Sequence, residues 1–224
     1  MIFPKAWSTI LYELQKVYPE ALMAGGCIRD AILGKPIKDL DIYINPNTQR
    51  WEGDIAQRMP QAEIIPPKTM QILGWTSQQI TDLDEGEYAK CGDIIGLWDI
   101  FRRDRYGEEY SDIQIIWKEF PLSVHSVVKS FDIGLCKVAW NGRQLYKHPD
   151  FVWDVKHERI SIVNETNGHE AHAARVAEKY KWPIWRAIQA YPDRKVKAHY
   201  PLNQNNDLCG GIFYPCQKNY ISLN

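Results

Sequence analysis

The chain has 224 residues, of which 45% are hydrophobic and 25% are charged, and its formal net charge is −1. This composition is typical of a globular protein and excludes a disordered chain, a collagen-like repeat and a coiled coil. Apolar runs end far short of the roughly 20 residues that a membrane span needs, and the N-terminus lacks the features of a signal peptide. The five cysteines are scattered and odd in number, which favours a reducing compartment. We therefore expect a soluble cytoplasmic protein without a membrane partner.

The charge is distributed unevenly along the chain. Residues 51–116 hold six Lys/Arg against thirteen Asp/Glu, whereas residues 117–224 hold fifteen against ten, together with all six histidines. Such asymmetry is found in proteins with a nucleic-acid-binding half, and an ordinary solvated surface would explain it equally well.

Helices and strands alternate in the first part of the chain. Apolar spacing, glycines and prolines predict these elements in order: helix 5–17, strand 21–24, helix 27–33 ended by Gly34, strand 39–44 and helix 48–58. Residues 60–92 contain three prolines and many polar residues, and we interpret them as an insertion that leaves the core.

Strands continue in the second part and are followed by helices. The predicted elements are a hairpin of strands 94–102 and 112–117, a strand over 131–139 that turns at Asn141-Gly142, helical structure from about 154 that includes 167–182 and 183–190, and an irregular stretch in the last 24 residues. The fold class is therefore α+β. We expect a head over 1–153, built on a mixed β-sheet flanked by helices, and a helical neck with an irregular tail over 154–224.

Two chemical features lie close together between residues 24 and 42. Gly25 and Gly26 stand where a strand meets a helix, so a phosphate could approach the backbone N–H groups, although a tight turn without a ligand would use the same pair. Asp39 and Asp41 are two residues apart on a strand, so both side chains project from one face. Such carboxylates repel each other unless a cation such as Mg²⁺ lies between them, and a solvated strand edge is the alternative interpretation.

Together these features resemble the head-domain signature of the class II tRNA nucleotidyltransferase and poly(A) polymerase family, within the DNA polymerase β superfamily. That signature is G-G-x-[VI]-R-D-x-[LI]-L-G, a short turn, then D-x-D-[IL]. The matching residues are Gly25, Gly26, Ile28, Arg29, Asp30, Leu33, Gly34, Asp39, Asp41 and Ile42. The resemblance implies that Asp39 and Asp41 hold Mg²⁺ (or Mn²⁺). It also implies that Gly25, Gly26 and either Arg29 or Lys38 surround the triphosphate of an NTP substrate.

The resemblance continues more weakly towards the C-terminus. The family carries a third carboxylate on a later strand, for which Asp112 is the first candidate and Asp99 its rival. Asp132 resembles one position of the family's R-R-D-F-T-I-N-A element, whose two arginines are missing here. The family also has a helix, R-x-L-R-A-x-R-F-A, whose side chains lie near the nucleotide. At the same place this sequence has His169, His172 and Arg175. The resemblance implies that they contact the nucleotide, and a solvated helix face is the alternative interpretation.

Two parts of the family pattern are missing. The nucleotide-selecting motif E-D-x-x-R has no match, and the helical body that measures a tRNA has no counterpart after the neck. The choice of base and the recognition of a tRNA elbow are therefore not carried over. Cys209 and Cys216 have no second close pair, so zinc is not expected.

The sequence therefore predicts a metal-dependent nucleotidyltransferase that transfers an NMP from an NTP to an acceptor hydroxyl and releases pyrophosphate. The catalytic and metal-binding residues are Asp39, Asp41 and Asp112. An RNA 3′ end is the first choice of acceptor, from the resemblance and the basic C-terminal half, and a protein or small-molecule hydroxyl is the alternative. A catalytically inactive nucleotide- or RNA-binding module is the rival class, which the weakened arginine motifs favour and the intact D-x-D opposes.

Overall fold

The computed structural model describes residues 3–45, 65–80, 94–103, 109–118, 122–164, 168–186 and 212–215. The helices are α1 (Lys5–Gln15), α2 (Gly26–Ile32), α4 (Pro67–Leu73), α5 (Val124–Ser130), α6 (Pro149–His157), α7 (His169–Tyr180) and the short 3₁₀ helix η3 (Gly134–Cys136). The strands are β1 (Leu22–Ala24), β2 (Leu40–Ile44), β3 (Ser77–Ile80), β4 (Ile94–Arg103), β5 (Glu109–Lys118), β6 (Val138–Trp140), β7 (Gln144–Lys147), β8 (Ile160–Ile162), β9 (Ile184–Arg186) and β10 (Ile212–Pro215). Within these residues no helix is long and apolar enough to cross a membrane.

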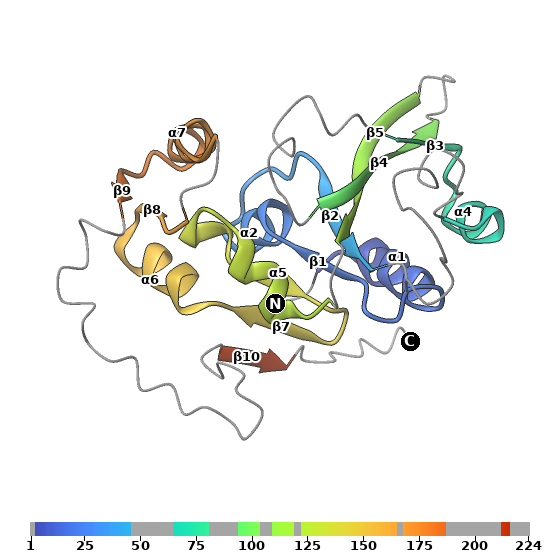
Figure 1. Ribbon diagram of the computed structural model, residues 1–224, viewed down its shortest axis with the longest axis horizontal. Coiled ribbons are helices and arrows are strands. Elements are labelled where there is room, and N and C mark those ends of the chain that lie inside the picture. The colour runs from blue at the N-terminus through green and yellow to red at the C-terminus, as the bar shows by residue number, and fades with distance from the viewer. Residues whose placement is uncertain are drawn as a thin grey trace, which may run out of the picture.

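A mixed sheet forms the centre of the molecule (Figure 1). Eight of the described strands pair in the order β10-β7-β6-β1-β2-β5-β4-β3. Strands β2 and β5 run parallel, and their neighbours in this sheet pair antiparallel. Parallel strands need a long connection. Here that connection lets the D-x-D segment pair with a strand that lies about 70 residues later in the chain.

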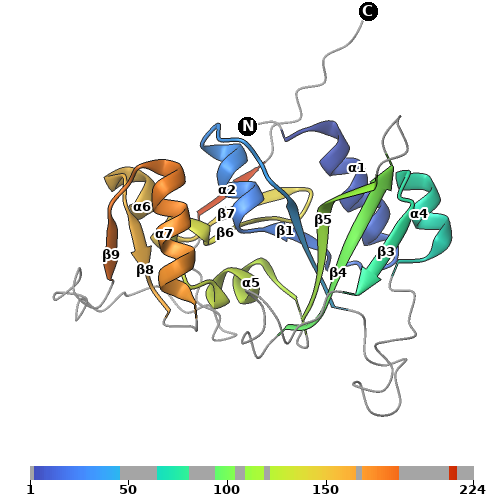
Figure 2. The ribbon, with the colours of Figure 1, turned by 90° about the horizontal axis from the view of Figure 1, so that it is seen from above.

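Helices cover both faces of this sheet (Figure 2). Helices α1 and α2 lie on one side, where their buried residues Leu11, Leu14 and Ile28 join the larger apolar cluster. Helix α5 lies on the other side, where Val127 and Val128 join a smaller cluster. The sheet is therefore the middle of three layers.

A smaller unit follows the sheet. Strands β8 and β9 form a parallel pair, with Ile160 opposite Ile184, and α6 and α7 lie beside them. An isolated bridge between Ile133 and Ile162 connects this unit to the segment before β6. Helix α7 of this unit packs against α2, where Lys179 and Tyr180 donate to Asp30.

The structure confirms the predicted fold class, α+β with a mixed sheet flanked by helices. The strand predicted over 131–139 is wrong in its first part, which contains η3, and only β6 is a strand. Gly134 explains the turn, because an added Cβ would lie 2.7 Å from Oδ2 of Asp154, so the backbone packs directly against α6. Helix α5 was not predicted, although Ser123 and Ser126 form a reciprocal capping box at its start.

Two further predictions need correction. The helix predicted over 183–190 is wrong where the structure describes it, because 184–186 form β9, and Pro183 keeps Trp182 out of helical backbone geometry. Within the predicted insertion 60–92, β3 pairs with β4 and extends the sheet.

The helix predicted over 48–58 and most of the C-terminal tail lie outside the described residues. The predicted division into 1–153 and 154–224 stays a prediction.

Candidate active site

The two glycines form the turn between β1 and α2. Gly25 has φ 79° and ψ −132°, a backbone conformation that other residues avoid, and its N–H donates to the carbonyl of Val138 at 2.9 Å. An added Cβ at Gly25 would lie 3.4 Å from the ring of Phe131. At Gly26 the nearest atom to such a Cβ belongs to the Arg29 guanidinium, at 3.6 Å. The turn is therefore held against β6 and the Phe131 ring.

Asp39 is the residue before β2, and Asp41 is the second residue of that strand. Strand β1 runs antiparallel to β2 with Met23 opposite Ile42, so the glycine turn and these carboxylates share one end of the sheet. The Asp39 side chain is 32% exposed, and Nζ of the exposed Lys38 lies 3.5 Å from its Oδ2. Asp41 is half-buried. Both carboxylates lie on the same face of the sheet as Tyr43, because side chains alternate along a strand.

Asp112 lies on β5, the neighbour of β2. Leu40 pairs with Ile113 and Asp41 pairs with Gln114. The register of β5 with β4 shifts between Ile100 and Phe101, which makes Asp112 the extra residue of a β-bulge. Arg102 of β4 donates to Oδ2 of Asp112. The third candidate carboxylate therefore lies next to the D-x-D strand, in an ion pair with an arginine.

Asp99, the rival of Asp112, lies one strand further away. It faces Gln114 across the β4–β5 ladder, and Nε2 of Gln114 donates to its Oδ1 at 3.1 Å. Because neighbouring strands are about 4.8 Å apart, Asp99 on β4 is roughly 10 Å from β2. The sheet therefore places Asp41, Gln114 and Asp99 in one row, with Asp112 nearer to the D-x-D.

The donor set fits a hard divalent cation in part. Carboxylate oxygens are the ligands that Mg²⁺ prefers, and it usually takes only one or two of them together with substrate phosphates. Asp39 and Asp41 provide two on one strand face, and Oδ1 of Asp112 is buried without a hydrogen-bond partner among the described residues. Among the residues that the structure describes, no group of three or more His, Cys, Asp or Glu side chains is close enough together to hold a metal ion. Oδ2 of Asp112 is in contact with Arg102 instead.

Cys27, the second residue of α2, lies behind the D-x-D strand. Burial raises the pKa of its thiol, and the negative charges of Asp41 and Asp39 raise it further. The thiol is therefore neutral at physiological pH and belongs to the core.

Arg29, predicted to contact the triphosphate, is 5% exposed. Its Nε donates to Oδ1 of Asp30 at 2.7 Å and to the hydroxyl of Tyr180 at 3.2 Å, and its Nη1 lies 3.0 Å from Sγ of Cys136. Nζ of Lys179 donates to Oδ2 of Asp30 at 2.6 Å. In this structure the Arg29 guanidinium is thus part of a buried network that joins α2 to α7.

Asp132 and His172 form a second connection to α7. Nδ1 of His172 lies 3.0 Å from Oδ2 of Asp132. Burial alone would lower the pKa of His172, but its hydrogen bonds to Asp132 and Cys136 outweigh burial and raise the pKa to about 10. His169 is half-buried and Arg175 is exposed on the same helix. The structure therefore brings Asp132 and His172 together, and it leaves Arg175 at the surface.

Residues 2–158 match the family described as Gad2, Gabija anti-defense 2 family protein. The chain belongs to the Gad2 family. No curated protein matches this Gad2-family chain.

Solved structures of tRNA-processing enzymes are similar to the Gad2-family chain at low identity. "The structure of CCA-adding enzyme apo form I" matches with a TM-score of 0.50 at 14% identity, over 84% of this chain and 42% of that chain. The Bacillus stearothermophilus CCA-adding enzyme in complex with CTP matches with a TM-score of 0.48 at 17% identity, over 82% of this chain and 42% of that one. The Gad2-family chain spans less than half the length of these structures. The first likeness shows the head fold alone.

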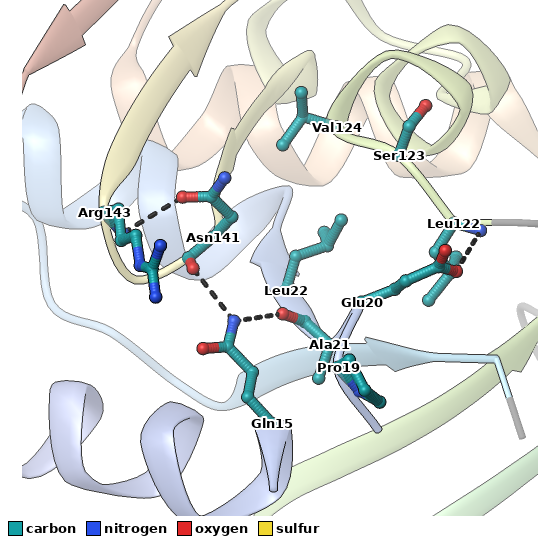
Figure 3. A pocket seen from close by; sticks show the side chains of 10 residues that line it. All are labelled: Gln15, Pro19, Glu20, Ala21, Leu22, Leu122, Ser123, Val124, Asn141 and Arg143. Atoms are coloured by element: carbon teal, nitrogen blue, oxygen red, sulfur yellow. Dashed lines mark hydrogen bonds between the residues drawn. The ribbon is translucent and has the colours of Figure 1, made fainter. Parts of the chain in front are cut away.

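A polar pocket lies elsewhere on the Gad2-family chain (Figure 3). It has a volume of about 410 Å³ and includes Gln15, Glu20, Asn141 and Arg143 among its lining residues. Nε2 of Gln15 donates to the carbonyls of Ala21 and Asn141, at 2.8 and 2.9 Å. The pocket adjoins the start of β1, whereas the glycine turn follows its end. None of the predicted site residues lines it.

Sequence reasoning missed several residues that surround the candidate site. Arg102 and Gln114 contact the two rival carboxylates, and Phe131 packs against the glycine turn. Lys179 and Tyr180 contact Asp30 from 149 and 150 residues away. A polar residue two positions after Asp112 on the same strand was a visible signal for Gln114. No local pattern points to the others.

Proposed function

We propose that this Gad2-family chain is a metal-dependent nucleotidyltransferase that transfers an NMP from an NTP to an acceptor hydroxyl. The observation that carries the proposal is the D-x-D pair. Asp39 and Asp41 lie on one face at the start of β2, beside the parallel strand that holds Asp112 and at the same end of the sheet as the Gly25 turn. Two closely spaced carboxylates next to a backbone turn suit a phosphoryl-transfer platform.

The reaction is a displacement at the α-phosphorus of the NTP. The acceptor oxygen forms a new P–O bond, the bond between the α-phosphorus and the bridging oxygen breaks, and pyrophosphate leaves with that oxygen. When bound by Asp39 and Asp41, Mg²⁺ or Mn²⁺ would offset the triphosphate charge and favour ionisation of the acceptor hydroxyl.

The chain's own residues would supply the remaining steps. Asp112 on β5 is the nearest further carboxylate, and it would accept the proton of the acceptor hydroxyl. Lys38 is 89% exposed beside Asp39 and is positioned to contact phosphate oxygens as a mobile cation. The Gly25 turn keeps side-chain bulk away from this end of the sheet.

Two acceptor classes follow from two separate observations. The motif resemblance between residues 24 and 42 and the CCA-adding head fold support an RNA 3′ end. The family description, Gabija anti-defense 2, supports a hydroxyl on a component of the Gabija defence system, and transfer to it would inactivate that component. In both cases the chemistry at the α-phosphorus is the same.

Label transfer tests this proposal. The protein is incubated with each α-³²P-labelled NTP and Mg²⁺ or Mn²⁺, with total RNA and with extract from cells that carry a Gabija system. Asp39→Asn and Asp41→Asn should abolish labelling while the circular dichroism spectrum stays unchanged. Glu158→Gln, which removes an exposed charge elsewhere, should leave labelling intact.

The sensitivity of the labelled band then identifies the acceptor. Loss of the label to RNase indicates RNA, and loss to protease indicates a protein. NTP binding without pyrophosphate release in every mixture would favour a binding module instead of an enzyme.

A further inference from the structure

The ion pair between Arg102 and Asp112 occupies the place where the candidate metal site lacks its third carboxylate. Arg102 of β4 donates to Oδ2 of Asp112 of β5, and their side chains are 37% and 31% exposed. The pair exists because of the β-bulge, since the shift of register after Ile100 places Asp112 opposite no single residue of β4.

The second oxygen of Asp112 is unsatisfied in this arrangement. Oδ1 is buried and accepts no hydrogen bond from the described residues. A buried carboxylate oxygen without a partner is costly, and a cation beside it removes that cost. Asp99 differs in this respect, because an uncharged amide, Nε2 of Gln114, donates to its Oδ1.

A guanidinium and a divalent cation compete for one carboxylate. Arg102 satisfies part of the Asp112 charge, and its own positive charge also repels a divalent cation a few ångströms away. Both effects lower the affinity of the Asp39–Asp41–Asp112 set for metal as long as the ion pair stays closed.

We propose that Arg102 is an internal counter-cation that holds Asp112 in the metal-free protein and must leave it before the full divalent site forms. This inference rests on the proposed function, because it takes Asp39 and Asp41 as the metal-binding pair. Arg102 is thus a positioning residue that sets the metal affinity of the site.

The test measures Mn²⁺ binding to the full chain without nucleotide, from the electron paramagnetic resonance signal of free Mn²⁺. Arg102→Gln should bind Mn²⁺ about fivefold to tenfold more tightly than the wild type, the size of effect expected for removing one nearby charge at a partly exposed site. Arg102→Lys keeps the charge and should stay near the wild-type affinity.

Two further variants define the site of the effect. Arg143→Gln removes an exposed charge at the pocket of Figure 3, away from Asp112, and should not change Mn²⁺ affinity. The double variant Arg102→Gln/Asp112→Asn should lose the gain that Arg102→Gln produces alone, because the carboxylate that the cation gains is then absent. Thermal unfolding of each variant in EDTA checks that the fold is intact.

The outcomes separate this inference from the proposed function. If Asp39→Asn and Asp41→Asn weaken Mn²⁺ binding but Arg102→Gln does not strengthen it, the role of Arg102 is overturned and the metal-binding pair stands. If Asp39→Asn and Asp41→Asn bind Mn²⁺ as the wild type does, the metal-binding pair is wrong and the role of Arg102 is overturned with it. A gain in Arg143→Gln equal to that in Arg102→Gln would show a general charge effect and would also overturn the inference.

Discussion

Nδ1 of His172 on α7 lies 3.0 Å from Oδ2 of Asp132, a residue 40 positions earlier in the segment before β6. This contact holds a helix of the smaller unit against the sheet domain. Because the pKa of His172 is raised to about 10, the imidazolium is the form present at neutral pH, and the contact is an ion pair there.

The pH dependence of stability should report this ion pair. A raised pKa in the folded state adds stability that is complete below the unfolded value of about 6.5 and is lost as the pH rises towards about 10. At pH 6, His172→Gln should lower the free energy of unfolding by about 1.5–3 kcal/mol, the range for hydrogen bonds to charged groups. Near pH 10 the difference from the wild type should nearly vanish. Urea denaturation at both pH values measures it, with the exposed His157→Gln as control, and an equal difference at both would contradict the ion pair.

Gly25→Ala should destabilise the protein more than Gly34→Ala. Both glycines have positive φ, 79° and 64°, so alanine costs backbone strain of about 1 kcal/mol or more at each. At Gly25 the ψ of −132° also lies outside the left-handed region, in backbone that only glycine adopts readily, whereas the Phe131 ring, 3.4 Å from the new methyl, is in ordinary van der Waals contact. The midpoint of thermal unfolding should be lower for Gly25→Ala than for Gly34→Ala, and the opposite order would show that the Gly25 backbone conformation is not strained for alanine.

The buried network around Asp30 should dominate the stability of the contact between α2 and α7. Burial raises the pKa of Asp30, but the hydrogen bonds from Arg29, Lys179 and Tyr180 outweigh it, so the pKa is lowered overall. Asp30→Asn leaves the Arg29 charge buried without its anion and should cost about 3–5 kcal/mol.

Chemical denaturation tests this network against an exposed ion pair. Glu170→Gln removes the partner of Arg186 at the surface and should change the unfolding free energy by less than about 1 kcal/mol. Because the pKa of Asp30 is lowered in the folded state, its contribution should decline as the pH falls below its unfolded value of about 3.9. Similar costs for both substitutions would show that the Asp30 network is not a buried structural unit.

The two rival carboxylates should differ in their effect on nucleotidyl transfer. Asp112→Asn should reduce the rate of label transfer by at least about 100-fold, as expected when a general base is lost. Asp99→Asn should keep most of the activity, because Asp99 lies two strands from β2 and already pairs with Gln114. Single-turnover assays at saturating Mn²⁺ compare the two variants, and the reverse ranking would make Asp99 the third carboxylate.

The amino-acid sequence by itself determined the features that depend on neighbouring residues. Alternation along a strand places Asp39 and Asp41 on one face whatever the rest of the chain does. Glycines where a strand meets a helix predict the Gly25 turn, and its positive φ agrees with that prediction. The strands at 39–44, 94–102 and 112–117, the helix at 5–17 and the α+β class follow from local periodicity in the same way.

The tertiary structure alone decided which partners these residues have. Arg29 looks like a phosphate ligand in its motif, yet its guanidinium contacts Tyr180, 151 residues away, because α7 packs against α2. The register of β5 against β4 creates the bulge at Asp112 and brings Arg102 to it, and periodicity carries no information on that register. Contacts between distant segments depend on how whole elements pack, so no window of sequence around either residue contains them.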